Sequence, residues 1–203
     1  MTRIDSLEQL HALYGEPHER SLRKEIPYLS EPYQALIAAA PFVVLATSGP
    51  EGLDCSPRGD APGFVRVLDE RTLALPDRPG NNRIDSLRNI VQDPRVALLF
   101  LIPGVGESLR VNGRASISLE PELLEACRAQ GKLPRSVLRV TVDSCYFQCS
   151  KAIVRSRLWE PEQQVLRSSL PSPGDILKTL MDPQFDVQAY ERELQERLRT
   201  GLY

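Results

Sequence analysis

The sequence has few of the side chains that perform most acid–base and metal chemistry in proteins. It contains two histidines, His11 and His18, and four cysteines among 203 residues. Both histidines fall in one N-terminal segment, so the sequence offers no credible Ser-His-Asp or Cys-His arrangement and no histidine general base. The aspartates and glutamates are scattered without a motif. This composition suits a protein whose cofactor carries out the reaction while the chain binds and orients it.

The cysteines do not form a metal-binding pattern. Cys145 and Cys149 are spaced CxxxC rather than CxxC, and the two histidines are far away in the sequence. A zinc site needs more closely matched spacing, so we expect no metal site and interpret the cysteines as small buried thiols. Four cysteines in a chain of this length, without a secretory signal, indicate a reduced set and a cytoplasmic protein.

An excess of positive charge and long apolar runs are also absent. The formal net charge is -2 and the sequence pI is about 5.8, without the basic stripe of a nucleic-acid binder. Any bound anion must therefore be held by a few local groups. No run of about 18 apolar residues predicts a membrane span, and residues 1–10 lack the apolar region of a secretory signal. We expect neither a nucleic-acid nor a membrane partner.

The chain does contain many short strand-like segments separated by turns and helical segments. The pattern predicts strands at residues 42–48, 53–57, 63–68, 72–75, 95–102, 108–118 and 136–147, and helices at residues 4–14, 33–40, 82–91 and 121–130. The strand at 95–102 is apolar enough to be buried on both faces, and Asn112-Gly113 predicts a bulge or bend. Strands and helices do not alternate one-to-one, so we predict a mainly β protein, a closed or half-closed antiparallel barrel with appended helices.

Arg58 is the first candidate ligand-binding residue. It lies in the sequence Ser-Pro-Arg-Gly-Asp, where Gly59 permits a close approach of the backbone. A guanidinium can bind phosphate through two parallel hydrogen bonds. The alternative is that Arg58 is a surface partner in a salt bridge.

A second candidate is the segment between a predicted strand and the helix predicted at residues 82–91. The sequence places Asn81, Asn82 and Arg83 here, with Asn82 as the expected N-cap and Arg83 at the first helical position. A helix N-terminus offers free backbone N–H groups and the positive end of the helix dipole, which favour phosphate. The alternative is an ordinary capped helix without a ligand.

A third candidate group follows the last predicted strand. Lys151 and Arg155 are four residues apart and would share one face of a helix or of an extended segment. Trp159, the one tryptophan, could stack on an aromatic ligand beside these two cations. The alternative is a tryptophan in the core or in an interface, with both charges in solvent. Arg110 and Arg114 could likewise face a ligand or lie on a solvated barrel face.

These motifs together resemble one family of flavoproteins. The order FVVLATS, DCSPRGDAPGFV, TLALPDRPGNNRIDSLRNI, DPRVALLFLIPG, LRVNGRA and CSKAIVRSRLW is similar to the pyridoxamine 5'-phosphate oxidase-related proteins that bind flavin mononucleotide (FMN), and more narrowly to their bacterial FMN-dependent branch. The resemblance covers residues 42–159. It implies a six-stranded antiparallel split β-barrel at residues 42–160, an N-terminal helical extension at residues 1–41, and a linker with a helical tail at residues 161–203.

The resemblance also implies a site and a function. The family forms homodimers with FMN at the interface. By resemblance, Arg58 and the Asn82-Arg83 pair contact the phosphate and ribityl chain, and the backbone of Leu75-Pro76-Asp77 lies along the isoalloxazine edge. Lys151, Arg155 and Trp159 would approach the ring side. They could belong to the same subunit or to the second one.

The resemblance therefore implies an FMN-dependent oxidoreductase acting on a small-molecule substrate. No histidine follows residue 18, so the Arg-x-His substrate motif of true pyridoxamine-phosphate oxidases is missing, which puts vitamin B6 oxidation in doubt. The alternatives are a flavin-binding protein without catalysis, a barrel that binds haem or a deazaflavin (F420), and a purely structural dimer.

Overall fold

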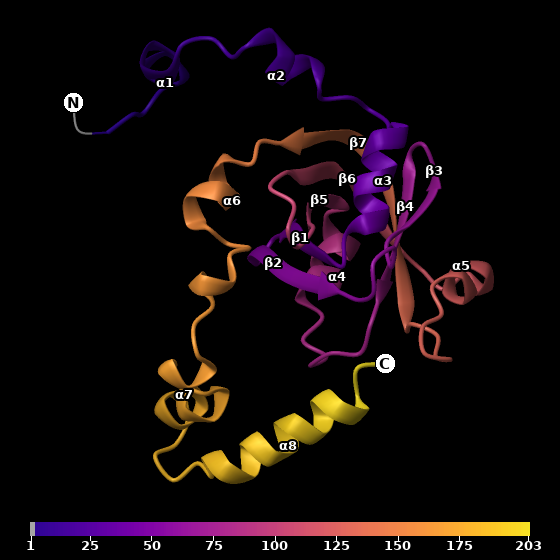
Figure 1. Cartoon of the computed structure of the whole chain (residues 1–203). Coiled ribbons are helices and arrows are strands. Elements are labelled where there is room, and N and C mark those ends of the chain that lie inside the picture. The colour runs from indigo at the N-terminus through magenta and orange to yellow at the C-terminus, as the bar shows by residue number, and fades with distance from the viewer. Residues whose placement is uncertain (1–2) are drawn as a thin grey trace.

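The strands form one antiparallel sheet that closes part of the way into a barrel. The computed structural model describes residues 3–203 (Figure 1). The strand order is β2-β1-β5-β6-β7-β4-β3, with one strand for each of the seven predicted segments and one more than the resemblance implied. Their bounds are β1 Phe42–Gly49, β2 Gly52–Gly59, β3 Arg66–Asp69, β4 Thr72–Asp77, β5 Arg95–Leu101, β6 Ser108–Ser118 and β7 Ser136–Gln148. The predicted fold class, a mainly β split barrel with added helices, is confirmed.

Eight α-helices of the described residues surround this sheet. They are α1 Leu7–Tyr14, α2 Glu19–Arg23, α3 Glu31–Ala39, α4 Asp85–Gln92, α5 Pro121–Ala126, α6 Lys151–Ser156, α7 Pro173–Leu180 and α8 Val187–Thr200. Short 3-10 turns at Pro161–Gln163 and Arg167–Ser169 connect α6 to α7. Within residues 3–203, no helix is both long enough and apolar enough to cross a membrane.

Three predicted boundaries were wrong for local reasons. The helix predicted at 82–91 begins only at Asp85, because Asn82 and Ile84 have φ angles of 60° and 54° that a right-handed helix excludes. The helix predicted at 121–130 ends at Ala126, since residues 129–132 form a tight turn. The strand predicted at 63–68 begins at Arg66, because Gly63 has a φ of 80° within a turn.

Burial alternates along the central strands, as the period of two requires. Val43, Leu45 and Thr47 of β1 are buried. The residues between them are only half-buried, and β5 alternates in the same way. The prediction that the strand at 95–102 is buried on both faces was therefore wrong. At β1 and β5 the sheet therefore has a buried inner face and a half-exposed outer face, whereas β4 is buried on both faces.

The inner face of the sheet packs around one hydrophobic core. Every strand except β2 and β3 contributes fully buried or nearly buried apolar side chains to it. Leu29, Tyr33 and Ile37 also belong to this core, so α3 and the segment before it are packed against the sheet. By contrast, α1 buries no residue, and its three leucines, Leu7, Leu10 and Leu13, are exposed.

An irregularity does occur at Asn112-Gly113, but the extra residue is Asp143 of the partner strand β7, and β6 keeps a regular register with β5. The register of β6 against β7 shifts between Asn112 and Gly113. A Cβ atom at Gly113 would lie 2.2 Å from the carbonyl oxygen of Thr141. The close approach of the two backbones therefore leaves no room for a side chain.

We expect the Gly113→Ala variant to be less stable by about 1–3 kcal/mol, the usual effect of overpacking. Urea denaturation followed by circular dichroism measures the free energy of unfolding. Gly80→Ala is the matched control, because nothing lies within 4 Å of a Cβ atom at Gly80. Equal unfolding midpoints for the two variants would contradict this account of the bulge.

Candidate functional site

A cavity of about 1580 Å³ lies where the two open edges of the sheet approach each other. It lies between β2 and the end of β4, and its walls include the loop of residues 78–84, the start of α4 and the C-terminal residues of the chain. Most of the site residues predicted from the sequence line it: Arg58, Gly59, Pro76, Asp77, Asn81, Asn82 and Arg83. The loop of residues 78–84 is called the cradle loop below.

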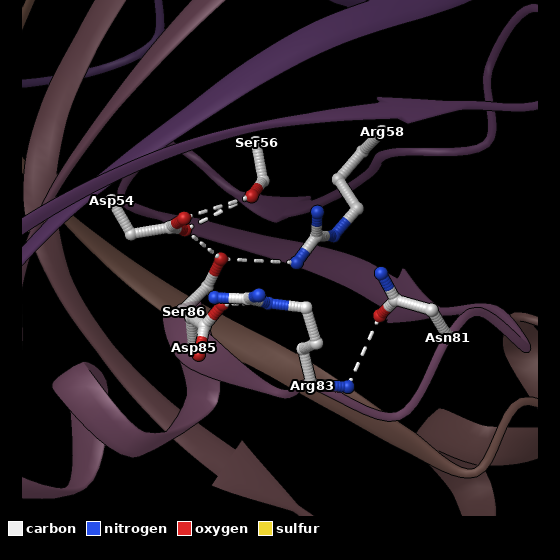
Figure 2. Close-up of polar contacts among 7 residues, drawn as sticks. All are labelled: Asp54, Ser56, Arg58, Asn81, Arg83, Asp85 and Ser86. Atoms are coloured by element: carbon white, nitrogen blue, oxygen red, sulfur yellow. Dashed lines mark hydrogen bonds and ion pairs between the residues drawn. The ribbon is translucent and has the colours of Figure 1, made fainter. Parts of the chain in front are cut away.

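Arg58 is fixed by a hydrogen-bonded network that joins β2 to the first turn of α4 (Figure 2). Its Nη2 donates to the hydroxyl of Ser86 at 3.2 Å, and the Ser86 hydroxyl in turn donates to the carboxylate of Asp54. The Ser56 hydroxyl donates to the same carboxylate at 3.0 Å. Ser86 is only 2% exposed, so this network holds the guanidinium at the cavity wall.

The period of two along β2 explains this arrangement. Residues 54, 56 and 58 pair with Thr47, Leu45 and Val43 of β1, and these three are buried on the inner face. Asp54, Ser56 and Arg58 therefore point toward the inside of the barrel at its open edge. Arg58 was a candidate from the sequence, whereas Asp54 and Ser56 were not, although their alternation with Arg58 was a usable signal.

The N-terminus of α4 opens into the cavity without a side-chain cap. Asn82 was predicted as the N-cap, and that prediction was wrong: the cap position is Ile84, in a left-handed conformation and with no capping hydrogen bond. Ile84, Asp85, Ser86 and Leu87 all line the cavity. The first backbone N–H groups of a helix have no partner within the helix, so they are available to a ligand here.

The two asparagines of the cradle loop shape the loop instead of capping the helix. The Oδ1 atom of Asn81 accepts from the backbone N–H of Arg83 at 3.0 Å. The Oδ1 atom of Asn82 accepts from Nη1 of Arg135 at 2.7 Å. Because both carbonyl oxygens are used in this way, each side chain retains its amide N–H₂ group as a donor.

Arg83 was expected to place a full charge at the first helical position, but the structure corrects this expectation. Asp85 occupies that position, and Nε of Arg83 donates to its carboxylate at 2.8 Å. This hydrogen bond and the charge of Asp85 raise the pKa of the Arg83 guanidinium. The side chain of Arg83 is 75% exposed, so a ligand would compete with Asp85 for it.

Two other arginines at the cavity are free of carboxylate partners among residues 3–203. These are Arg58 and Arg135, whereas Arg78 forms an ion pair with Asp60 at 2.8 Å. Both free guanidiniums lie near Asp77: burial raises the pKa of that carboxyl, while the charges of Arg58 and Arg135 oppose the shift. The cavity thus contains two guanidinium groups whose positive charge is not neutralised by an ion pair. Nothing in the sequence singled out Arg135.

The end of β4 presents an open backbone edge. Residues 75–77 pair with β7, but β3 pairs with β4 only as far as Ala74. No described strand covers the opposite edge of residues 75–77. Pro76 and Asp77 line the cavity, whereas the Leu75 side chain is fully buried in the core. Any contribution of Leu75 to a ligand must therefore come from its backbone.

The third candidate group does not lie in the cavity of its own chain. Lys151 and Arg155 both lie in the short helix α6, but neither they nor Trp159 line the cavity. The indole Nε1 of Trp159 donates to the carbonyl of Val105 at 2.8 Å. Within one chain Trp159 therefore anchors the loop after β5.

The cysteines and acidic side chains form no metal centre within the described part of the chain. No group of three or more His, Cys, Asp or Glu side chains is placed to hold a metal ion among residues 3–203. Cys127 and Cys145 are buried, as expected, but Cys55 and Cys149 are exposed. The expectation of four buried thiols was therefore wrong for two of them.

Comparison with known proteins adds a family match. Residues 29–149, more than half of the chain, match the family described as pyridoxamine 5'-phosphate oxidase. None of the curated proteins matches the chain.

The chain also resembles several solved structures at low identity. HupZ of Group A Streptococcus is 23% identical over 60% of this chain and 94% of its own, with a TM-score of 0.48. General stress protein 26 of Bacillus anthracis is 16% identical over 56% and 88%, with a TM-score of 0.44. An FMN-binding protein of Syntrophomonas wolfei is 14% identical over 70% and 95%, with a TM-score of 0.47.

Proposed function

Because the chain belongs to the pyridoxamine 5'-phosphate oxidase family, we propose that its cavity binds FMN and that it is an FMN-dependent oxidoreductase acting on a small molecule. The observation that carries the proposal is the uncapped N-terminus of α4, which opens into the cavity beside Arg58. A helix N-terminus and a fixed guanidinium together form an anion-binding site. The cavity volume of about 1580 Å³ exceeds the roughly 300–1000 Å³ of typical ligand pockets.

The residues present fit the phosphate end of FMN. Arg58 would bind the phosphate with the guanidinium N–H groups that Ser86 and the Pro57 carbonyl leave free. The first N–H groups of α4 and the side-chain amides of Asn81 and Asn82 would complete the donor set, with Gly59 at the cavity wall. Arg83 would add positive charge by releasing the carboxylate of Asp85 and binding the phosphate instead. Arg135 would hold the side chain of Asn82 in place.

The remaining groups would bind and orient the flavin ring. The open backbone edge of Leu75, Pro76 and Asp77 offers hydrogen-bonding groups to a planar heterocycle. When bound, FMN would supply the hydride chemistry, for which this histidine-poor chain offers no side-chain substitute. The role of the protein would be to bind the cofactor, exclude water and leave one face of the ring to a substrate.

We also propose that the protein is a homodimer with FMN at the interface. The outer face of β1, β2 and β5 brings together Phe42, Val44, Leu99 and Leu101, with Pro57 of β2 on the other side of Val44, from cross-strand pairs. A contiguous apolar patch on a sheet face commonly marks an interface. In such a dimer, Lys151, Arg155 and Trp159 would approach the flavin of the second subunit. The four free cysteines support a cytoplasmic location.

The absorbance spectrum of the purified protein tests the cofactor, followed by heat release and chromatography of the ligand. The bands of an oxidised flavin and FMN in the supernatant are the expected result. A Soret band would show that the protein binds haem instead of FMN. Release of a deazaflavin would show that it binds F420 instead. A colourless protein that does not take up added FMN would rule the proposal out.

The second candidate is a flavin-binding protein without catalysis, which is favoured by the lack of histidine in the cavity. Steady-state turnover of the FMN-loaded protein with NADH or NADPH and an electron acceptor separates the two. Turnover well above that of free FMN supports the oxidoreductase, and turnover equal to free FMN supports the binding protein.

A further inference from the structure

The C-terminal segment forms one wall of the cavity although it is connected to the barrel by an exposed strap. After α6 the chain runs away from the sheet, and every residue from 160 to 171 is exposed. The helices α7 and α8 follow, and the last residues return to the barrel (Figure 1). Because no side chain of this strap is buried, the strap contributes little to fixing the C-terminal segment in place.

The helices α7 and α8 hold each other rather than the barrel. Ser172 and Asp175 form a reciprocal capping box at the start of α7. The backbone N–H of Gly174 donates to the carboxylate of Glu191 in α8 at 2.8 Å. A Cβ atom at Gly174 would lie 2.8 Å from Cγ1 of Val187, so the two helices are in close contact. The two helices therefore form one packed unit.

A small polar cluster joins this unit to the barrel. The hydroxyl of Tyr203 donates to Oδ1 of Asp60 at 2.6 Å, and Nζ of Lys132 donates to the carbonyl of Tyr203 at 2.7 Å. Arg78 pairs with the other oxygen of Asp60 and lies over the Tyr203 ring, 5.4 Å from its centroid. These four residues are called the latch.

The latch is well defined on the barrel side. The side chains of Asp60 and Arg78 are 4% and 15% exposed. Burial alone would raise the pKa of Asp60, but hydrogen bonds from Tyr203, the Ala61 N–H and Arg78 outweigh it and lower the pKa. The carboxylate is therefore charged at neutral pH and offers a strong acceptor to the Tyr203 hydroxyl.

The surface that the tail turns toward the cavity is apolar, in contrast to the polar cradle opposite. Tyr190, Leu194, Leu198 and Leu202 line the cavity from α8 and the residues after it, together with Arg197. Arg197 already pairs with Glu193 at 2.7 Å. The tail therefore presents a largely apolar wall to whatever the cradle binds.

We propose that the C-terminal segment, residues 172–203, is a lid that closes the FMN cavity and that the Tyr203–Asp60–Arg78–Lys132 latch holds it shut. Only the identity of the ligand, FMN, rests on the proposed function. The exposed strap lets the α7–α8 unit swing away, and the latch sets how often it does so. Opening the lid admits and releases ligand, and closing it excludes water from the cavity.

Two variants weaken the latch without touching the phosphate-binding groups. Tyr203→Phe keeps the ring over Arg78 and removes only the hydroxyl, and Lys132→Met removes a donor that lies outside the cavity. Tyr14→Phe and Lys178→Met are the matched controls, since Tyr14 is 76% exposed in α1 and Lys178 is exposed on α7.

Hydrogen–deuterium exchange of the full-length protein without added ligand is the first readout. Both latch variants should exchange faster than wild type in the cradle loop and in residues 198–203, and the controls should match wild type. Unchanged exchange in both latch variants would overturn the lid, whatever the ligand is.

The rate of FMN release from the loaded protein, followed by flavin fluorescence after dilution, is the second readout. We expect release about tenfold faster in each latch variant, the usual effect of losing a hydrogen bond to a charged group. Release at the wild-type rate with faster exchange would also overturn gating by the lid. If wild type binds no FMN, the proposed function fails, while hydrogen exchange still decides whether the latch holds the tail.

Discussion

Replacing Arg58 with methionine is expected to weaken FMN binding by about a hundredfold or more. Methionine keeps much of the length of the side chain but removes the charge and every donor. Each hydrogen bond to a charged phosphate is worth about 1.5–3 kcal/mol, and the fixed guanidinium would make two. Titration of apoprotein with FMN, followed by quenching of flavin fluorescence, gives the dissociation constants.

Arg114→Met is the control for this experiment. Arg114 is an exposed arginine on β6 that does not line the cavity, so its replacement should leave the affinity unchanged. Circular dichroism of both variants verifies that each is folded, because Ser86 and Asp54 remain hydrogen-bonded to each other without Arg58. Equal FMN affinities for wild type and folded Arg58→Met protein would remove Arg58 from the site.

Replacing Val44 with glutamate is expected to convert the proposed dimer to a monomer. Val44 lies on the outer face of β1 between Pro57 of β2 and Leu99 of β5. Its half-exposed position lets a folded monomer accept the carboxylate. In a dimer the same carboxylate would be buried against apolar side chains, and an unpaired buried charge is strongly unfavourable. We expect the dissociation constant of the dimer to rise at least a hundredfold. Sedimentation velocity over a dilution series measures it.

Val91→Glu serves as the control, because Val91 is 76% exposed on α4 and away from this face. The variant should sediment as wild type does. If wild type is a dimer and Val44→Glu remains the same dimer, the interface lies elsewhere. A monomeric wild type would contradict the proposed dimer itself.

The sheet was predictable from the sequence because its strands are short apolar runs of β-favouring residues bounded by turn residues. Thus Phe42–Gly49, Arg95–Leu101 and Ser108–Ser118 lie within one or two residues of their predicted bounds. The start of α4 was not predictable, because Asn82 and Ile84 adopt positive φ angles. A β-branched isoleucine seldom adopts that conformation, and only the surrounding structure can impose it.

The candidate site was also predictable only in part. The cradle loop and Arg58 were found because glycine, proline, asparagine and arginine gather locally in the sequence. The partners that fix them come from far along the chain: Ser86 meets Asp54 across 32 residues, Asn82 meets Arg135 across 53, and Tyr203 meets Asp60 across 143. A single sequence carries no signal for such tertiary contacts. The contacts by which the C-terminal segment forms a wall of the cavity could therefore not be predicted.

The central claim is that the α4 N-terminus and Arg58 bind the phosphate of FMN. Parallel titration of the apoprotein with FMN and with riboflavin, which has the same ring and ribityl chain but no phosphate, tests it most directly. The account predicts that FMN binds and that riboflavin binds at least about a hundredfold more weakly, because the charge-assisted hydrogen bonds are lost. Equal affinities for the two ligands, or no binding of FMN, would contradict it.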